Sequence, residues 1–77
     1  MEEPKIGDIY KHFKGNNYKI IAIARDSDTL EKLVVYQGLY SNEEFGDNPI
    51  WTRPLENFLE TISRKGKEIK RFSLLDI

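Results

Sequence analysis

Cysteine is absent from the sequence, and histidine, tryptophan and methionine occur once each. Without cysteine there can be no disulfide bond and no zinc site built on thiolates. Because His12 is the single histidine, any chemistry that needs an imidazole base is limited to that position. No apolar run is long enough to cross a bilayer, and residues 1–5 are charged, unlike a signal peptide. We therefore expect a soluble cytoplasmic protein without membrane contact.

Neither sign of charge dominates, because 12 basic residues face 13 acidic ones for a formal net charge of −1. This balance disfavours a broad electrostatic surface for nucleic acid, which usually has an excess of lysine and arginine. Locally, charges cluster in an acidic loop at 43–47 and in a basic stretch at 64–71. The simplest interpretation of both is a solvated surface, and a phosphate-binding patch on the basic stretch is the alternative.

The 77 residues predict a single small domain, 1–77, with no repeat or linker. Alternation of apolar and polar residues, bounded by turn-forming residues, predicts five strands at 9–13, 18–24, 32–40, 50–52 and 69–75. The second of these is apolar on both faces, with Ile20 and Ala22 on one and Ile21 and Ile23 on the other, which is typical of a central or bent strand. In the third, Gly38 predicts a bulge, or a place where another backbone or a ligand comes close.

One helix is predicted after the fourth strand. Pro54 suits its first turn, Thr52 or Arg53 its cap, and Gly66 its end. Its apolar stripe follows helical spacing and consists of Leu55, Phe58, Leu59 and Ile62. The expected fold is mainly β: a small, strongly bent antiparallel sheet of about five strands with one short helix before the last strand, whose inward residues are Phe72 and Leu74. A partly open SH3-like barrel would close such a sheet with the fewest residues.

An ordered set of residues along the chain resembles the DUF1653 family, a group of small bacterial domains of unknown function. The resemblance runs from about Gly7 to Phe72, and it is carried by Tyr10, His12, Phe13, Gly15, Tyr18, Val34, Val35, Tyr36, Leu39, Tyr40, Trp51, Arg53, Pro54, Phe58 and Arg71. It implies a compact β-rich domain and brings no established activity.

Catalytic and metal chemistry find little support in the sequence. The serines that could partner His12 lie in turn-like or exposed contexts, and no nucleophile-elbow motif is present. Asp26 and Asp28 alternate as at the start of a calcium loop, but the glycine and late glutamate of such a loop are missing. We predict that these carboxylates cap backbone amides instead. No catalytic residue, metal ligand or cofactor is predicted.

Aromatic and arginine side chains are the candidates for ligand binding, because they combine large contact areas with directed donors. If they share a face, Tyr36, Tyr40, Trp51 and Arg53 would line a groove with Tyr10 and His12 at its rim. The alternative places Tyr36 and Trp51 in the core and pairs Arg53 with Glu56 or Glu31.

Three functions are compatible with these patterns. The favoured hypothesis is a non-catalytic binding module whose aromatic–arginine groove takes a nucleotide, single-stranded nucleic acid or a peptide. The second is a small enzyme, or an enzyme subunit, that uses His12 on an anionic substrate. The third is a structural protein-interaction domain that docks through an edge strand or the loop around Phe45. A monomer or weak dimer is expected.

Overall fold

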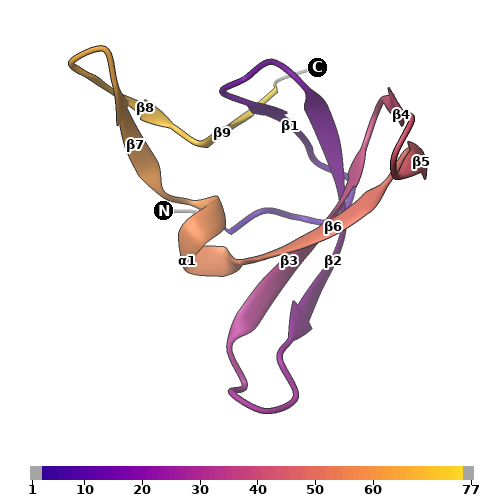
Figure 1. Ribbon diagram of the computed structural model, residues 1–77. Helices are drawn as coiled ribbons and strands as arrows, with labels where there is room; N and C mark the ends of the chain where they lie inside the picture. Colours follow the sequence, from indigo (N-terminus) through magenta and orange to yellow (C-terminus); the bar gives the residue numbers. More distant parts are fainter. Residues whose placement is uncertain (1–2, 76–77) are drawn as a thin grey trace.

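The protein is described by a computed structural model over residues 3–75, which form nine strands and one helical turn (Figure 1). The elements in chain order are β1 (Ile9–His12), β2 (Asn17–Arg25), β3 (Lys32–Gly38), β4 (Ser41–Asn42), β5 (Gly46–Asp47), β6 (Ile50–Pro54), α1 (Leu55–Phe58), β7 (Thr61–Arg64), β8 (Lys67–Lys70) and β9 (Phe72–Leu74). No helix in the described part of the chain has the length and apolarity to cross a bilayer.

Five of the strands form one antiparallel sheet in the order β6-β3-β2-β1-β9. The remaining strands pair as two small hairpins, β4–β5 and β7–β8, which lie on opposite sides of the molecule in Figure 1. Within residues 3–75, no backbone pairing joins the edge strands β6 and β9, so the sheet does not close into a barrel. The prediction of a mainly β domain around a five-stranded antiparallel sheet with one short helix is confirmed.

A bulge in β2 explains why that strand is apolar on both faces. Its pairing with β3 shifts register between Ile20 and Ala22, so that Ile20 lies opposite Tyr36 and Ile23 lies opposite Val34. A bulge inserts one unpaired residue and reverses the alternation beyond it. Ile23 therefore packs against the core on the same side as Ile20, and its predicted place on the opposite face is wrong.

The core is built mainly from rings. Its buried residues are Tyr10, Ile20, Val34, Tyr36, Phe58 and Phe72. Phe58 of α1 stacks on Phe72 of β9 with ring centroids 4.1 Å apart and planes 9° from parallel. The prediction that Phe72 points inward is confirmed, whereas Leu74 is 55% exposed and its predicted inward place is wrong.

The helix is one turn long, shorter than its apolar stripe predicts. It begins after Pro54, has no side-chain cap, and leaves Thr52 and Arg53 in β6. Ile62 lies instead on β7, opposite Ile69 of β8. The turn between β7 and β8 is formed by Lys65 and Gly66, both at positive φ (53° and 76°), the conformation of a tight two-residue hairpin. The predicted helix end is thus a hairpin turn.

Candidate functional site

A pocket of about 210 Å³ opens on the inner face of the sheet. Five predicted side chains line it, namely His12, Tyr36, Tyr40, Trp51 and Arg53, and Tyr18 and Phe72 complete its wall. Strand pairing brings them together, because residues directly opposite each other in antiparallel strands share a face. Tyr36 lies opposite Trp51, Tyr18 opposite Gly38, and His12 opposite Phe72.

Three side chains on one side of the pocket are joined through their polar groups. The Trp51 indole Nε1 donates a hydrogen bond of 3.1 Å to the Tyr40 hydroxyl. The Tyr40 hydroxyl is also hydrogen-bonded to that of Tyr18, at 3.3 Å. Burial, followed by the hydrogen bond with Tyr40, raises the pKa of Tyr18 to about 12. This side of the pocket is therefore uncharged at neutral pH.

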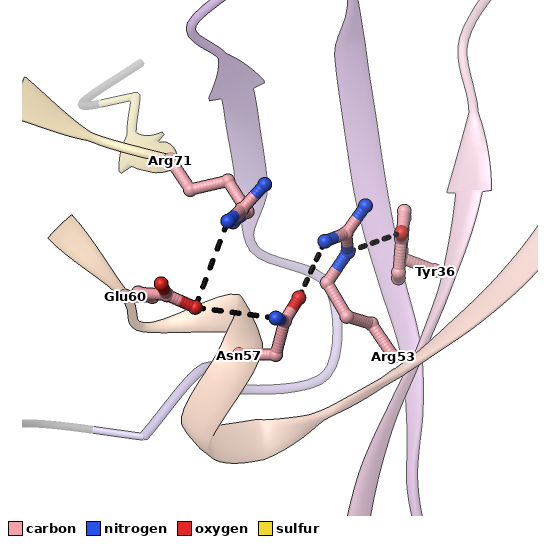
Figure 2. Close-up of polar contacts among 5 residues, drawn as sticks. All are labelled: Tyr36, Arg53, Asn57, Glu60 and Arg71. Carbon is pink, nitrogen blue, oxygen red and sulfur yellow. Dashed lines mark hydrogen bonds and ion pairs between the residues drawn. The ribbon is translucent and has the colours of Figure 1, made fainter. Parts of the chain in front are cut away.

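Arg53 provides the fixed positive charge of the pocket. Its Nε donates to the Tyr36 hydroxyl at 3.2 Å, and its Nη1 donates to Oδ1 of Asn57 on α1 (Figure 2). Its guanidinium also lies over the Phe72 ring, 5.6 Å from the centroid. No ion pair joins Arg53 to Glu56 or Glu31, both of which the structure describes, so the alternative pairing of Arg53 is wrong.

A polar chain extends from Arg53 to a second arginine (Figure 2). Asn57 Nδ2 donates to Glu60 Oε2 at 3.2 Å, and the same oxygen lies 3.6 Å from Arg71 Nη2. The link from Arg53 to this carboxylate runs through the neutral Asn57 amide. This polar chain thus contains two guanidinium groups and one carboxylate, an excess of positive charge on this side of the pocket.

His12 is held in one tautomer. Its Nδ1 accepts a hydrogen bond of 3.1 Å from the backbone amide of Lys14, so the proton of the neutral ring is on Nε2. The ring packs edge-on against Phe72 at a centroid distance of 4.9 Å. Burial lowers the pKa of His12, and the positive charges of Arg53, Arg71 and Lys14 lower it further. The ring is therefore a neutral donor at physiological pH.

Tyr36 serves both the core and the pocket. It is only 4% exposed, as the core interpretation requires, while its hydroxyl is the acceptor that positions Arg53. Trp51 is half-buried, packs against the core and lines the pocket. The alternatives of core and pocket are therefore not exclusive for these two rings.

Tyr10 does not lie at the rim of this pocket. Its ring is buried and meets Phe58 edge-on at 5.1 Å. Tyr10 lines a second pocket together with Asp8, Leu59 and Lys70, among others. The alternation of β1 does place Tyr10 and His12 on one face, but Phe72 lines both pockets and lies between the two sites.

Four residues with a role at the pocket were not predicted as site residues. Tyr18 and Phe72 line it, Asn57 positions Arg53, and Phe45 packs edge-on against Trp51 with centroids 5.2 Å apart. Tyr18 could have been identified from the hairpin register, which places it on the face of Tyr36. Asn57 had no such indication, because its contact depends on where the single helical turn ends.

In the aspartate turn at 26–29, the predicted capping of backbone amides is seen for Asp26. Asp26 Oδ1 accepts hydrogen bonds from the backbone amides of Asp28 at 2.8 Å and Thr29 at 3.1 Å. The bonds from Thr29 and Asp28 lower the pKa of the Asp26 carboxyl. Among residues 3–75, no three histidine or acidic side chains are grouped as metal ligands would be.

Fold and pocket together define a small open-sheet domain with an aromatic–arginine pocket, and comparison with known proteins places it. Residues 8–74 match the family described as Protein of unknown function (DUF1653), and the chain belongs to that family. It is similar to the crystal structure of a DUF1653 protein from Bordetella bronchiseptica, with 32% sequence identity and a TM-score of 0.79. That similarity covers 94% of this chain and 87% of the other. No functionally curated protein matches the chain.

Proposed function

We propose that this domain is a non-catalytic binding module, whose pocket takes one flat ring of a ligand that also carries an anionic group, as a nucleotide does. The observation that supports it most is the pairing of stacking surfaces with a fixed cation. Trp51 and Tyr40 offer aromatic surface, and Arg53 is held beside them by Tyr36 and Asn57. A guanidinium held in this way loses little conformational freedom when it binds an anion.

The size of the pocket limits what it can enclose. Pockets that bury a drug-sized molecule usually measure about 300 to 1,000 Å³. At about 210 Å³, this pocket is smaller. It suits a single ring, and the rest of the ligand would lie outside it.

The donors in the pocket favour an anionic or acceptor-rich ligand. Arg53 is positively charged, and His12 offers an Nε2–H group because its Nδ1 accepts the Lys14 amide. None of the residues that line the pocket is acidic. Phosphate and carboxylate oxygens accept from such donors, and the charged hydrogen bonds they form are stronger than neutral ones.

Binding explains these residues better than catalysis does. A general base needs a nucleophile within hydrogen-bond reach and commonly a third group that orients it. The Nδ1 atom of His12 accepts a hydrogen bond from the backbone amide of Lys14 and not from a hydroxyl group. The raised pKa of the Tyr18 hydroxyl also makes it a poor nucleophile at neutral pH.

The proposal is tested by following backbone and indole resonances while adenosine, uridine and guanosine monophosphates, or short peptides, are added. Saturable shifts centred on Trp51, Tyr40 and Arg53 are expected with at least one nucleotide. Arg53→Gln should weaken that binding about tenfold or more, because a hydrogen bond to a charged group contributes roughly 1.5 to 3 kcal/mol. Lys19→Gln, on the exposed outer side of β2, is the matched control and should bind normally.

Two outcomes would contradict the proposal. One is the absence of saturable shifts around the pocket with every nucleotide and peptide. The other is equal loss of affinity in Arg53→Gln and Lys19→Gln, which would mean that only general charge matters. Retained amide dispersion in Arg53→Gln must accompany the affinity measurement, because Arg53 also contacts the buried Tyr36.

A further inference from the structure

We infer that the occupant is single-stranded nucleic acid, with one unpaired base in the pocket and the adjoining phosphates running toward the β1–β2 turn and the β7–β8 hairpin. This inference rests on the proposed function, because it requires the pocket to be a binding site. It adds the class of ligand and the direction in which that ligand leaves the pocket.

The Phe13 ring, in the β1–β2 turn, lies next to the pocket and has a positively charged side chain on each of two neighbours, Lys14 and Arg64. The Phe13 ring is 4.5 Å from the His12 ring, centroid to centroid. Lys14 Nζ lies 5.8 Å from the Phe13 centroid, and Arg64 Cζ lies 5.5 Å from it. We call Phe13, Lys14 and Arg64 the cationic ridge. It combines an aromatic surface with two exposed positive charges just outside the pocket.

The ridge joins elements that are distant in sequence. Lys14 belongs to the β1–β2 turn, and Arg64 is the last residue of β7. The contact of the Arg64 guanidinium with the Phe13 ring brings this turn and the β7–β8 hairpin together at the ridge. Two residues of the basic stretch are therefore near His12: Arg64 lies over the neighbouring Phe13 ring, and the charge of Arg71 lowers the pKa of His12.

The opposite side of the pocket is negative. There Phe45 packs on Trp51, and the same β4–β5 hairpin contains Glu43, Glu44 and Asp47, all exposed. A polyanion entering the pocket would be repelled from this side and attracted to the cationic ridge. The charges thus set one exit direction, and they limit binding to a short strand.

A single-stranded nucleic acid has groups that fit both the pocket and the cationic ridge. Every base has a flat face that can stack on aromatic side chains, and the phosphates that follow it need cations at intervals. A base within a duplex is paired and stacked, and could not enter a pocket of about 210 Å³ without leaving the helix. A peptide could fill the pocket with one side chain, but it would bring no regular negative charge to Lys14 and Arg64.

The test uses Trp51 fluorescence, since the chain has a single tryptophan, to measure binding of oligothymidylates of one to eight nucleotides at several salt concentrations. Affinity should rise over the first few nucleotides and then level off. Lys14→Gln and Arg64→Gln should each weaken oligonucleotide binding roughly two- to fivefold at low salt, the range for exposed ion pairs. Each should also reduce the salt slope by about 0.7 and leave mononucleotide binding unchanged.

Charge variants in the acidic β4–β5 hairpin and on the outer side of β2 test whether the position of the charge matters. Glu43→Gln with Glu44→Gln should strengthen oligonucleotide binding or extend the length over which affinity rises, and Lys19→Gln should change nothing. Mononucleotide binding with no gain from added nucleotides would overturn this inference and leave the proposed function standing. Preferential binding of a peptide would overturn it as well. If no ligand perturbs Trp51, both the inference and the proposed function fail.

Discussion

The ring of Tyr40 occupies the space that a side chain on Gly38 would need. A Cβ built on Gly38 would lie 2.6 Å from Tyr40 Cε2 and 2.8 Å from its Cζ. Gly38 has no positive φ, so the glycine is required here by close approach and not by backbone conformation. The sequence predicted a bulge at Gly38, or the approach of another backbone or a ligand; the group that comes close is instead the side chain of Tyr40, two residues farther along the chain. The position of Tyr40 in the pocket depends on this glycine.

We expect Gly38→Ala to displace the Tyr40 ring and break its hydrogen bonds with Trp51 and Tyr18. Overpacking of this kind typically costs about 1 to 3 kcal/mol of stability. The indole Nε1–H resonance of Trp51 should shift, because it loses its acceptor, and urea denaturation would give the stability change. Combining Gly38→Ala with Tyr40→Ala should cost less than the sum of the two single changes. Additive costs would show that the ring and the new methyl group do not compete.

Asn57 is a positioning residue for Arg53, and its removal should separate affinity from stability. We expect Asn57→Ala to lower nucleotide affinity several-fold, because Arg53 Nη1 loses its acceptor and the guanidinium becomes freer. Stability should fall by about 1 kcal/mol, the usual net value of a hydrogen bond. Glu56→Ala, on the exposed side of the same helical turn, is the control. Unchanged affinity in Asn57→Ala would show that Tyr36 alone holds Arg53.

The lowered pKa of His12 predicts a pH dependence of folding with a definite sign. In the unfolded chain the ring titrates near its ordinary value of 6.5, whereas in the folded protein it takes up its proton only at lower pH. The unfolded state therefore binds more protons below pH 6.5, and the free energy of unfolding should fall as the pH drops from 7.5 to 5.5. Asp26 contributes a similar loss only at more acidic pH, because its ordinary value is 3.8.

Urea denaturation at a series of pH values would measure this dependence, with His12→Gln as the comparison. The variant should show a flatter profile between pH 7.5 and 5.5. Identical slopes in the wild type and the variant would mean that the His12 pKa is the same in both states. A stability that rises on acidification would reverse the predicted sign.

The turn of the β7–β8 hairpin should respond differently to substitutions at its two residues. Gly66→Ala places a Cβ at a φ of 76° and should destabilise the hairpin by about 1 kcal/mol. Lys65→Asn should be neutral or slightly stabilising, because asparagine accepts positive φ better than lysine does. Hydrogen exchange of the β7 and β8 amides would report both changes. Faster exchange in Lys65→Asn would contradict this account of the turn.

The sequence predicted the features that depend on neighbouring residues, such as which residues of a strand share a face. The inner face of β3 and the inward direction of Phe72 follow from alternation and from turn-forming residues, and that of Phe58 follows from helical spacing. The short strands β4, β5 and β7 were not predicted, and the strand predicted at 69–75 is divided between β8 and β9. Ile62 was assigned to the helix because apolar residues at three- and four-residue spacing fit a helical stripe. Its pairing with Ile69 depends on a hairpin turn that lies three to four residues farther on.

The site was predictable to the extent that strand register could be inferred. Tyr36 and Trp51 converge because they are directly opposite in β3 and β6. The different placement of Tyr10 has a tertiary cause, since Phe58 and Phe72 fill the space beside it. The bulge in β2 could not be predicted from the sequence either, because a continuous apolar run does not indicate which residue is left unpaired.

Both edges of the open sheet contribute to one pocket, with Trp51 and Arg53 from β6 and Phe72 from β9. A molecule held there would touch the two strands that no backbone hydrogen bonds connect. A bound ligand would then connect the two edge strands, β6 and β9, to each other. Because edge strands open most readily, their backbone amides should gain the most protection from hydrogen exchange when the pocket is filled. The incomplete closure of the sheet leaves the space in which this pocket opens.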